Sequence, residues 1–368
     1  MILHFNPTNY LRLEDPRAID TSAAGASFAT STGDIVEVTS YGPGVFRLRI
    51  GPRTSPDYGI VVGRSKSCTV AQPDAALTTF VAGDATLEIT GGPLAFRLLW
   101  RGAPVATSIT DQHFRGYTRL PAFGRIRQGG EWTAALALAS GEPVYGLGEK
   151  FGPLDKRGQL IHSQVEDALG VNTGLSYKNT PFAWSPGTGR GAWGLFVHTP
   201  GRVAHGVGHP DWSHRSYALV VDDEALDLFL FAADTPARIL DAYTDLTGRA
   251  PEVPRWSLGL WVSRAYYKTP EEAVGVAAKL RERRIPCDVI TLDGRAAWKV
   301  ETRFNFRWDP DRFADPRASL AAIRRHHLRV CVWEYPYVSI HDPLFQELVA
   351  KEFLLRNAYG DPYVFSWD

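Results

Sequence analysis

The hydrophobic pattern changes its period once along the chain, near residue 234, and this change limits the possible folds most strongly. Up to that point apolar and polar residues alternate, as in VFRLRI at residues 45–50, and Gly/Pro turns such as Gly42-Pro43-Gly44 separate the runs. Alternation with period two is typical of antiparallel strands that bury one face. We therefore expect residues 1–234 to form an antiparallel β-sandwich.

Beyond residue 234 the pattern is that of alternating helices and strands, and a helical linker over 235–255 comes first. Apolar strands joined by helices indicate parallel βαβ units that are buried on both faces. Residues 256–368 are thus expected to form about the first three βα units of a (β/α)8 barrel, with a doubly wound sheet as the alternative. The three apolar runs are SLGLWVS (257–263), CDVITLDG (287–294) and LRVCVWEYP (328–336).

The helix that follows each run has a recognisable start. Thr269, Asp315 and Asp342 each precede a proline, and a polar N-cap before a proline at the first helical position is a common helix start. After Thr269, apolar residues recur at i, i+3, i+4 and i+7, which provides one face for packing. Asp315, and likewise Asp309 in a Trp-Asp-Pro sequence, are therefore expected to be cap or turn residues.

Charge and cysteine content argue against several partners. Lys+Arg and Asp+Glu both number 40, which argues against nucleic acid and against an anionic membrane surface, and no run approaches the roughly 20 apolar residues of a membrane-spanning helix. Three scattered cysteines favour a cytoplasmic protein. No Gly-rich phosphate loop follows a strand, and the histidines of HGVGH (205–209) lack the context of a metal site, so we expect neither cofactor nor metal. The oligomeric state stays open.

The candidate site lies where the three parallel strands end, because the C-terminal ends of barrel strands form the active face. The residues there are Ser263 to Tyr267, Asp293 to Trp298, and Trp333 to Tyr337. Carboxylates accept hydrogen bonds from hydroxyl groups, and aromatic rings cover the apolar face of a sugar. This composition favours a carbohydrate ligand.

Several of these residues have a second interpretation. Asp293-Gly294 is also a common turn pair, and spacing alone favours neither the turn nor the site. Glu334 is either a second site carboxylate or the partner of a nearby arginine. Trp261 and Trp308 are expected in the core rather than in the site.

Six ordered motifs, from about residue 141 to the end, link the chain to a known family. They are VYGLGEKFG, SYKNTPFAWS with GAWGLFVHTPG, LTGRAPEVPRWSLGLW, VITLDGRAAW, FNFRWDPDRFADP and LRVCVWEYPYVS. In this order they resemble family 31 glycoside hydrolases, the retaining α-glucosidases and α-xylosidases. The resemblance implies a multidomain β plus α/β architecture, in which a galactose-mutarotase-like β-sandwich precedes the first part of a (β/α)8 TIM barrel. Residues 1–140 contain none of these motifs and resemble the family only as a β-sandwich that precedes the barrel.

The resemblance also implies a double-displacement mechanism, in which one Asp attacks the anomeric carbon and a second serves as general acid and then base. No carboxylate in residues 1–368 matches either role. The resemblance therefore assigns only substrate-binding positions of the family to this chain. Asp293 matches an Asp that binds hydroxyls of the glycone. Trp333 matches a Trp on the pocket floor, and Tyr266 matches an aromatic residue after the first strand. Asp167 matches, loosely, a sandwich loop that reaches over the pocket.

Departures from the family pattern concern the substrate. Gly294-Arg295 stands where similar enzymes carry bulkier residues after the Asp, so the glycine opens space and Arg295 offers donors to an acidic or heavily hydroxylated sugar. Glu334 also differs from its usual counterparts. We expect hydrolysis of terminal α-linked sugars in a small oligosaccharide or glycoside. The alternatives are a non-catalytic carbohydrate-binding protein, or another barrel enzyme that uses Asp293 and Glu334 as its acid and base.

Overall fold

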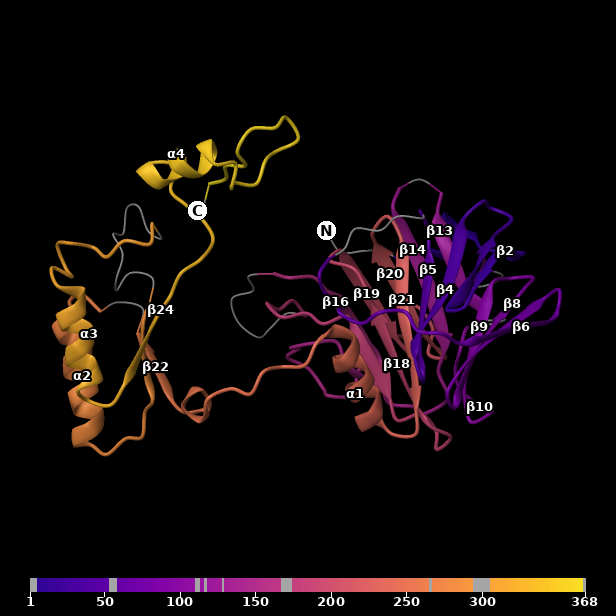
Figure 1. The fold of residues 1–368 in the computed structure, drawn as a ribbon, viewed down its shortest axis with the longest axis horizontal. Coiled ribbons are helices and arrows are strands. Elements are labelled where there is room, and N and C mark those ends of the chain that lie inside the picture. Colours follow the sequence, from indigo (N-terminus) through magenta and orange to yellow (C-terminus); the bar gives the residue numbers. More distant parts are fainter. Residues whose placement is uncertain are drawn as a thin grey trace. The chain divides into compact units, whose positions relative to one another are not determined.

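The computed structural model of the 368-residue chain divides by its contacts into two compact units, Met1–Ala250 and Pro251–Asp368. Figure 1 shows the course of the chain, and each unit is described by itself. The described residues are 5–366, apart from 53–57, 110–112, 116–117, 128, 167–173, 265–266 and 294–304.

The first unit is built from antiparallel sheets that pack face to face, as the alternating pattern predicts (Figure 1). The 3-10 helix η1 (Pro7–Asn9) precedes them. The 8-stranded sheet has the order β15 (Tyr145–Gly146), β17 (Phe182–Ser185), β18 (Ala192–Val197), β21 (Leu226–Ala233), β5 (Val45–Ile50), β4 (Ile35–Gly42), β3 (Gly25–Ala29) and β2 (Arg17–Ser22). The 6-stranded sheet has the order β1 (Tyr10–Arg12), β13 (Phe123–Ile126), β14 (Glu131–Ala137), β20 (Ser216–Asp222), β19 (Arg202–Val207) and β16 (Gln159–Ser163). A 5-stranded sheet contains β10 (Ala103–Thr107), β9 (Ala95–Trp100), β8 (Ala85–Thr90), β7 (Leu77–Ala82) and β6 (Thr69–Asp74), and a 2-stranded sheet contains β11 (His113–Arg115) and β12 (Thr118–Arg119).

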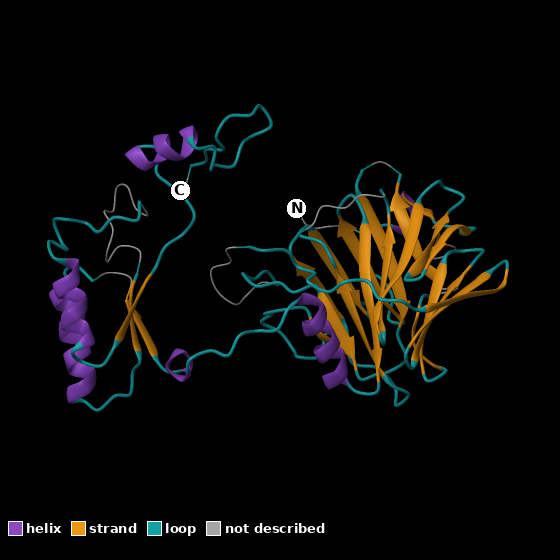
Figure 2. Cartoon of the chain, viewed as in Figure 1, coloured by secondary structure: helices purple, strands orange, loops and turns teal. Residues whose placement is uncertain are grey.

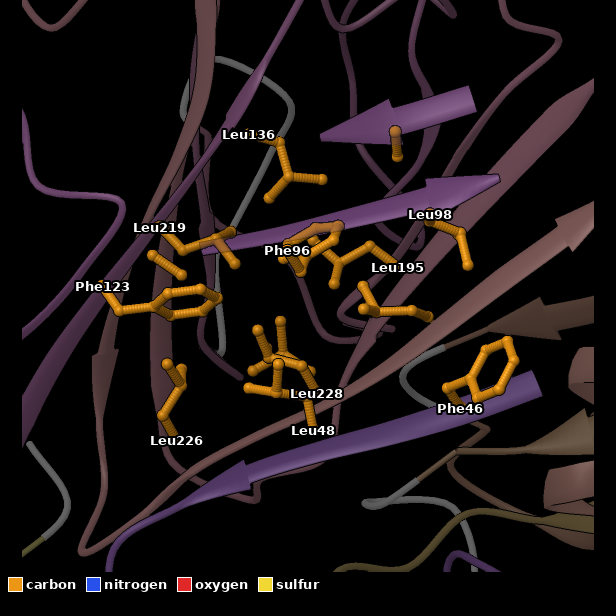
Figure 3. Packing of buried hydrophobic residues seen from close by; sticks show 14 of the residues in the cluster. Phe46, Leu48, Phe96, Leu98, Phe123, Leu136, Leu195, Leu219, Leu226 and Leu228 are labelled. Atoms are coloured by element: carbon orange, nitrogen blue, oxygen red, sulfur yellow. The ribbon is translucent and has the colours of Figure 1, made fainter. Parts of the chain in front are cut away.

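The core of this unit lies between the sheets, and alternating residues of each strand fill it (Figure 3). On β5, Phe46, Leu48 and Ile50 point into the core and are fully buried, while the arginines between them lie on the other face of the sheet. Leu228 of β21 and Leu219 of β20 meet them from neighbouring and opposing strands. The period-two prediction for these strands is confirmed.

Helix α1 (Pro236–Thr247) covers the outer face of the 8-stranded sheet. Its buried residues Ile239 and Leu246 pack against phenylalanines of β18 and β21. The approach is close because β18 contains Gly194, where an added Cβ atom would lie 2.7 Å from Cγ2 of Ile239. A side chain at this position would push the helix away from the sheet.

The second unit contains a parallel sheet in the order β22 (Trp261–Arg264), β23 (Val289–Leu292) and β24 (Arg329–Val332). Helices α2 (Pro270–Glu282) and α3 (Pro316–Arg324) pack on one side of these strands (Figure 2). This arrangement confirms the predicted βα units, in the order strand, helix, strand, helix, strand. Helix α4 (Pro343–Ala350) follows β24, and the 3-10 helix η2 (Arg255–Leu258) precedes β22.

The predicted helix caps are confirmed. The side chain of Thr269 accepts a hydrogen bond from the backbone N–H of Glu272, and Asp315 and Asp342 accept bonds from the first turns of α3 and α4. Glu272 in turn accepts a hydrogen bond from the N–H of Lys268, the residue before the cap, so the two side chains together satisfy N–H groups at the start of α2. These interactions link residues four or fewer positions apart, which is why the sequence predicts them.

Two expectations about burial in the second unit are wrong in part. Of the three strands, only β23 is buried along most of its length, whereas β22 is largely exposed. Trp261 was expected in the core, yet its side chain is 42% exposed because it lies on the face of β22 opposite the helices, where it stacks on Trp256. Trp308 does pack on the core, against Phe313. Among the helices of the described residues, none is long and apolar enough to cross a membrane.

Candidate functional site

The candidate site lies at the C-terminal edge of the parallel sheet. The register pairs Arg264 with Leu292, and Leu292 with Val332, so that the three strands end level with one another. Asp293 and Trp333 are the next residues of β23 and β24, and the N–H of Trp333 donates to the carbonyl oxygen of Leu292 at 2.9 Å. Two residues that lie 40 positions apart in the sequence are therefore neighbours at one edge.

The alternation of side chains places Asp293 on the face of the sheet that the helices leave uncovered. Ile290 and Leu292 point toward the helices and are fully buried in the core of the second unit. Asp293 is an odd number of residues away from Ile290 and Leu292, so its side chain points to the opposite face of the sheet. The side chain of Ser263 on β22 points to that face as well. The hydroxyl of Ser263 donates to Oδ2 of Asp293 at 3.3 Å, which confirms that both side chains lie on this face.

Aromatic rings extend from this edge. The ring of Trp333 meets that of Tyr335 edge-on with centroids 5.1 Å apart, and Tyr335 lies 4.9 Å from Tyr337. Tyr335 packs on the core of the unit, whereas the side chain of Trp333 is 39% exposed. The edge thus combines a half-buried carboxylate, Asp293, with an accessible indole ring.

The other predicted site residues divide into two groups. Glu334 lies next to Trp333 and is exposed, and no ion pair with an arginine is found for it among the described residues. Tyr266, Arg295 and Asp167 lie outside the described residues, and their places in the site remain predictions.

Three other carboxylates of the second unit have structural roles. Asp309 is buried, accepts a hydrogen bond from the N–H of Asp311 and pairs with Arg312 at 2.8 Å. Asp315 and Asp342 are the caps of α3 and α4. These three carboxylates are engaged in turns and caps, as expected for Asp309 and Asp315. Asp293 and Glu334 are the carboxylates of this unit that directly follow or adjoin the strand ends.

A polar network in the first unit holds the segments that flank residues 167–173. Lys150 Nζ donates to the carbonyl oxygen of His162 at 2.7 Å and to Oδ1 of Asn179 at 2.5 Å, and it also contacts the hydroxyl of Ser176 at 3.2 Å. Asn179 Nδ2 donates back to the carbonyl oxygen of Gln164 at 2.8 Å. Lys150 and Asn179 therefore tie strand β16 to both described ends of the segment that contains Asp167.

The half-buried amine of Lys150 gives a testable pH dependence. Burial lowers the pKa of Lys150 to about 8, and the charge of Lys156 acts in the same direction. The unfolded chain, with an ordinary lysine pKa of about 10.4, holds this proton more strongly between pH 8 and 10.4, so raising the pH through this window favours the folded state. We expect the unfolding free energy of the wild type minus that of Lys150→Met to increase by about 1–2 kcal/mol from pH 7 to pH 10. The increase is no larger because water screens this half-exposed group.

Urea unfolding of both proteins at several pH values measures this difference. Lys178→Met is the matched control, because Lys178 lies in the same segment but is exposed. If the unfolding free energy of the wild type minus that of Lys150→Met stays constant or decreases as the pH rises, the lowered pKa of Lys150 is contradicted.

His205, the first histidine of HGVGH, is buried between two hydroxyl groups of the first unit. Its ring nitrogens lie 2.9 Å from the hydroxyl of Ser163 and 2.8 Å from that of Tyr217, so both are engaged. Complete burial lowers the pKa of His205 to about 3, with Lys150 contributing in the same direction, and the imidazole is neutral. Within the described residues, no group of three or more His, Cys, Asp or Glu side chains could hold a metal ion.

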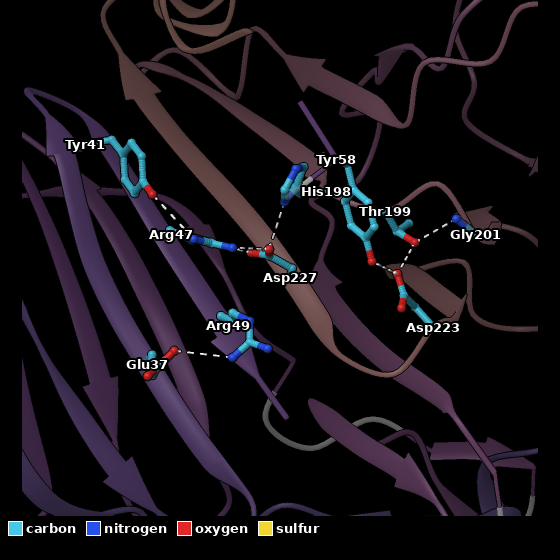
Figure 4. Close-up of polar contacts among 10 residues, drawn as sticks. All are labelled: Glu37, Tyr41, Arg47, Arg49, Tyr58, His198, Thr199, Gly201, Asp223 and Asp227. Carbon is cyan, nitrogen blue, oxygen red and sulfur yellow. Dashed lines mark hydrogen bonds and ion pairs between the residues drawn. The ribbon is translucent and has the colours of Figure 1, made fainter. Parts of the chain in front are cut away.

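A second polar cluster lies on the outer face of the 8-stranded sheet (Figure 4). Asp227 of β21 accepts hydrogen bonds from Arg47 Nε at 2.8 Å and Nη2 at 2.5 Å, and from His198 Nδ1 at 2.9 Å. Burial acts to raise the pKa of Asp227, but the bonds from Arg47 and His198 outweigh it and hold the pKa below its ordinary value. Because Asp227 and His198 are buried and engage each other, we assign this cluster to the stability of the fold.

Ser263 is the site residue whose role the sequence analysis did not identify. It falls inside the range of residues expected at the first strand end, but its hydrogen bond to Asp293 depends on the register of two strands 30 residues apart. The signal that identifies this role of Ser263 is the alignment of two parallel strands, which shows that Ser263 and Asp293 lie on the same face of the sheet.

Comparison with known proteins gives consistent results for both units. Residues 35–204 match the N-terminal galactose mutarotase-like domain of glycosyl hydrolase family 31, and residues 250–368 match the TIM-barrel domain of the same family. An α-xylosidase of Emericella nidulans is 32% identical over 238 residues, which cover 64% of this chain and 29% of that protein. An α-glucosidase of Bacillus thermoamyloliquefaciens is 27% identical over 349 residues, which cover 92% of this chain and 42% of that protein. The chain therefore spans less than half the length of these relatives.

Solved structures show the same fold. A family 31 dextranase of Flavobacterium johnsoniae, complexed with isomaltotriose, superposes with a TM-score of 0.82 at 19% identity, covering 97% of this chain and 43% of that one. A family 31 α-xylosidase from a soil metagenome, complexed with xylose, superposes with a TM-score of 0.76 at 19% identity, covering 95% of this chain and 52% of that one.

Proposed function

The chain belongs to glycoside hydrolase family 31, and we propose from this membership that it supplies the sugar-binding part of a retaining α-glycosidase. The observation that carries the proposal is the position of Asp293, on the uncovered face at the C-terminal edge of the parallel sheet and beside Trp333. In this proposal Asp293 accepts hydrogen bonds from hydroxyls of the terminal sugar, and Trp333 covers its apolar face. Tyr266, Arg295, Asp167 and Glu334 are the further proposed contacts.

The chemistry of the two central groups supports this assignment. An ionised carboxylate accepts hydrogen bonds at two oxygens, and such charge-assisted bonds are shorter and stronger than those between neutral groups. The apolar face of a pyranose packs well on an indole ring, which has a large, flat surface. A carboxylate for the hydroxyls and a ring for the carbon face together fix the orientation of a sugar.

The bond-breaking step is proposed to use residues beyond these 368. In a retaining mechanism, a carboxylate attacks the anomeric carbon while an acid protonates the leaving oxygen, and water then cleaves the covalent glycosyl–enzyme. No carboxylate of the chain matches the motifs that the resemblance implies for these two roles. We therefore expect this chain to bind sugar without hydrolysing it.

The names of the relatives support a terminal α-linked xylose or glucose as the substrate. The two sugars differ by a hydroxymethyl group, so the space beside Asp293 decides between them. Gly294-Arg295 follows Asp293 directly. We propose that this pair sets the preference, with the glycine leaving room and Arg295 donating to an additional oxygen.

A turnover assay tests whether this chain binds sugar without hydrolysing the glycosidic bond. The 368-residue chain is expected to release no nitrophenol from aryl α-glucosides or α-xylosides. If the coding sequence continues in frame into a Lys-x-Asp-Phe-Gly-Glu type motif, the longer product is expected to be active on one of them. Turnover by the 368-residue chain itself would contradict the proposal, and a stop codon at its end would favour a non-catalytic carbohydrate-binding protein.

A further inference from the structure

We propose that Ser263 is a positioning residue that holds the Asp293 carboxylate in the orientation needed for sugar hydroxyls. The inference deepens the proposed function and rests on it for the identity of the ligand. The contact itself is independent of that proposal, since Ser263 Oγ lies 3.3 Å from Asp293 Oδ2.

The geometry explains why a serine at this position reaches the carboxylate. Ser263 pairs in register with Thr291, and Asp293 is two residues further along the chain, just after β23 and on the same face. The backbone before Asp293 is held by the hydrogen bond from the N–H of Trp333 to the carbonyl of Leu292. Asp293 itself follows the end of the strand, and the hydroxyl of Ser263 is a lateral contact of its carboxylate.

The hydroxyl group is well suited to this task. It donates one hydrogen bond to one oxygen of the carboxylate, which can accept about four in all, so the bond orients the group without saturating it. A carboxylate already held in one rotamer loses less conformational freedom on binding a ligand, and pre-ordering of this kind increases affinity. Ser263 therefore contributes to binding through Asp293.

The same position is unimportant for the core. Ser263 is exposed, and it lies on the face opposite the helices that bury Ile290 and Leu292. Alanine at this position removes the hydroxyl without opening a cavity, so Ser263→Ala is expected to fold as the wild type does. Threonine retains a hydroxyl at the same branch point and suits a strand, which makes Ser263→Thr the conservative rescue.

The first measurement needs no sugar. Three-bond couplings to the Asp293 carboxyl carbon report the populations of its side-chain rotamers. We expect one dominant rotamer in the wild type and in Ser263→Thr, and averaged couplings in Ser263→Ala. Ser257→Ala is the control, because the hydroxyl of Ser257 donates to the carbonyl of Pro254 at 2.7 Å, in the same unit but away from Asp293. Unchanged couplings in Ser263→Ala would overturn the proposal.

The second measurement is the affinity for xylose and glucose. Ser263→Ala is expected to weaken binding roughly 3- to 10-fold, as expected for one hydrogen bond of moderate strength, and Ser263→Thr to restore it. Full affinity in Ser263→Ala despite averaged couplings would overturn the positioning role. If the wild type binds neither sugar while the couplings change as expected, the proposed ligand class fails but the Ser263–Asp293 interaction stands.

Discussion

Replacing Asp293 by alanine is expected to reduce the affinity of the chain for xylose or glucose by roughly a hundredfold or more. The proposed role gives this carboxylate at least two hydrogen bonds from sugar hydroxyls, and a hydrogen bond to a charged group contributes about 1.5–3 kcal/mol. Losing two such bonds costs roughly 3 kcal/mol or more, which corresponds to about two orders of magnitude in the dissociation constant. Calorimetric titration with each sugar measures it.

Two further variants make this experiment specific. Asp293→Asn keeps one acceptor oxygen and loses the charge, so we expect an intermediate loss of about tenfold. Glu352→Gln is the control, because Glu352 is an exposed carboxylate of the same unit that pairs with Arg356. If Asp293→Ala and Glu352→Gln bind sugar equally well, Asp293 is a turn residue and its part in the proposed function is wrong.

The second large effect concerns stability. Asp227→Ala is expected to lower the free energy of unfolding by about 3 kcal/mol, because it leaves the partly buried guanidinium of Arg47 and the buried His198 without their acceptor. Asp227 is 5% exposed and accepts hydrogen bonds from both Arg47 and His198 (Figure 4). Urea unfolding of the variant and the wild type measures the difference.

The chain contains a matched control for this substitution. Asp222 pairs with Arg202 at 2.5 Å, the same distance as in the Arg47–Asp227 pair, but both partners are more than a third exposed. Asp222→Ala is therefore expected to cost less than about 1 kcal/mol. Equal effects of the two substitutions would show that burial does not decide the contribution of these ion pairs.

The same carboxylate predicts how stability depends on acid. The native pKa of Asp227 is lower than its ordinary value, so the pair stabilises the fold above that ordinary value, and this stabilisation disappears as the pH falls through the native pKa. The stability difference between the wild type and Asp227→Ala should therefore narrow below about pH 4. A difference that persists unchanged to pH 2 would contradict this assignment.

Local features of the fold were predictable from the sequence. Phe46 and Leu48 alternate with arginines, and the side of the strand that they share is the buried one. Thr269 and Asp315 were recognisable as caps because the N–H groups they accept from lie only three residues away. Such signals need no knowledge of the tertiary structure.

Interactions between distant segments were not predictable in this way. The arginines of β5 point away from the core, as the alternation predicts, but the buried partner of Arg47 is Asp227, 180 residues away in the sequence. Ser263 likewise reaches Asp293 only because two parallel strands align in one register. Trp261 was misplaced because an apolar run does not reveal which face of its strand the helices cover.

The candidate site was predicted in outline by the rule that barrel strands present ligand-binding groups at their C-terminal ends. This rule, together with the family resemblance, selected Asp293 over Asp309 and Asp315. In the structure Asp293 directly follows β23, whereas Asp309 and Asp315 are engaged in a turn and a helix cap, and the sugar-binding role of Asp293 stays a prediction. The orientation of Asp293 within the edge depends on the register of β22 and β23, which the sequence does not reveal. The proposed preference for one sugar rests on Gly294 and Arg295, which lie outside the described residues.

A titration followed at the carboxyl carbon of Asp293 tests the central claim most directly. With xylose or glucose added to the 368-residue chain, its resonance is expected to shift and to saturate with the same dissociation constant that calorimetry reports. The indole resonance of Trp333 is expected to follow the same curve, because both groups lie at one edge of the sheet. A resonance of Asp293 that does not move at saturating concentrations of either sugar would contradict the claim that this carboxylate binds the glycone.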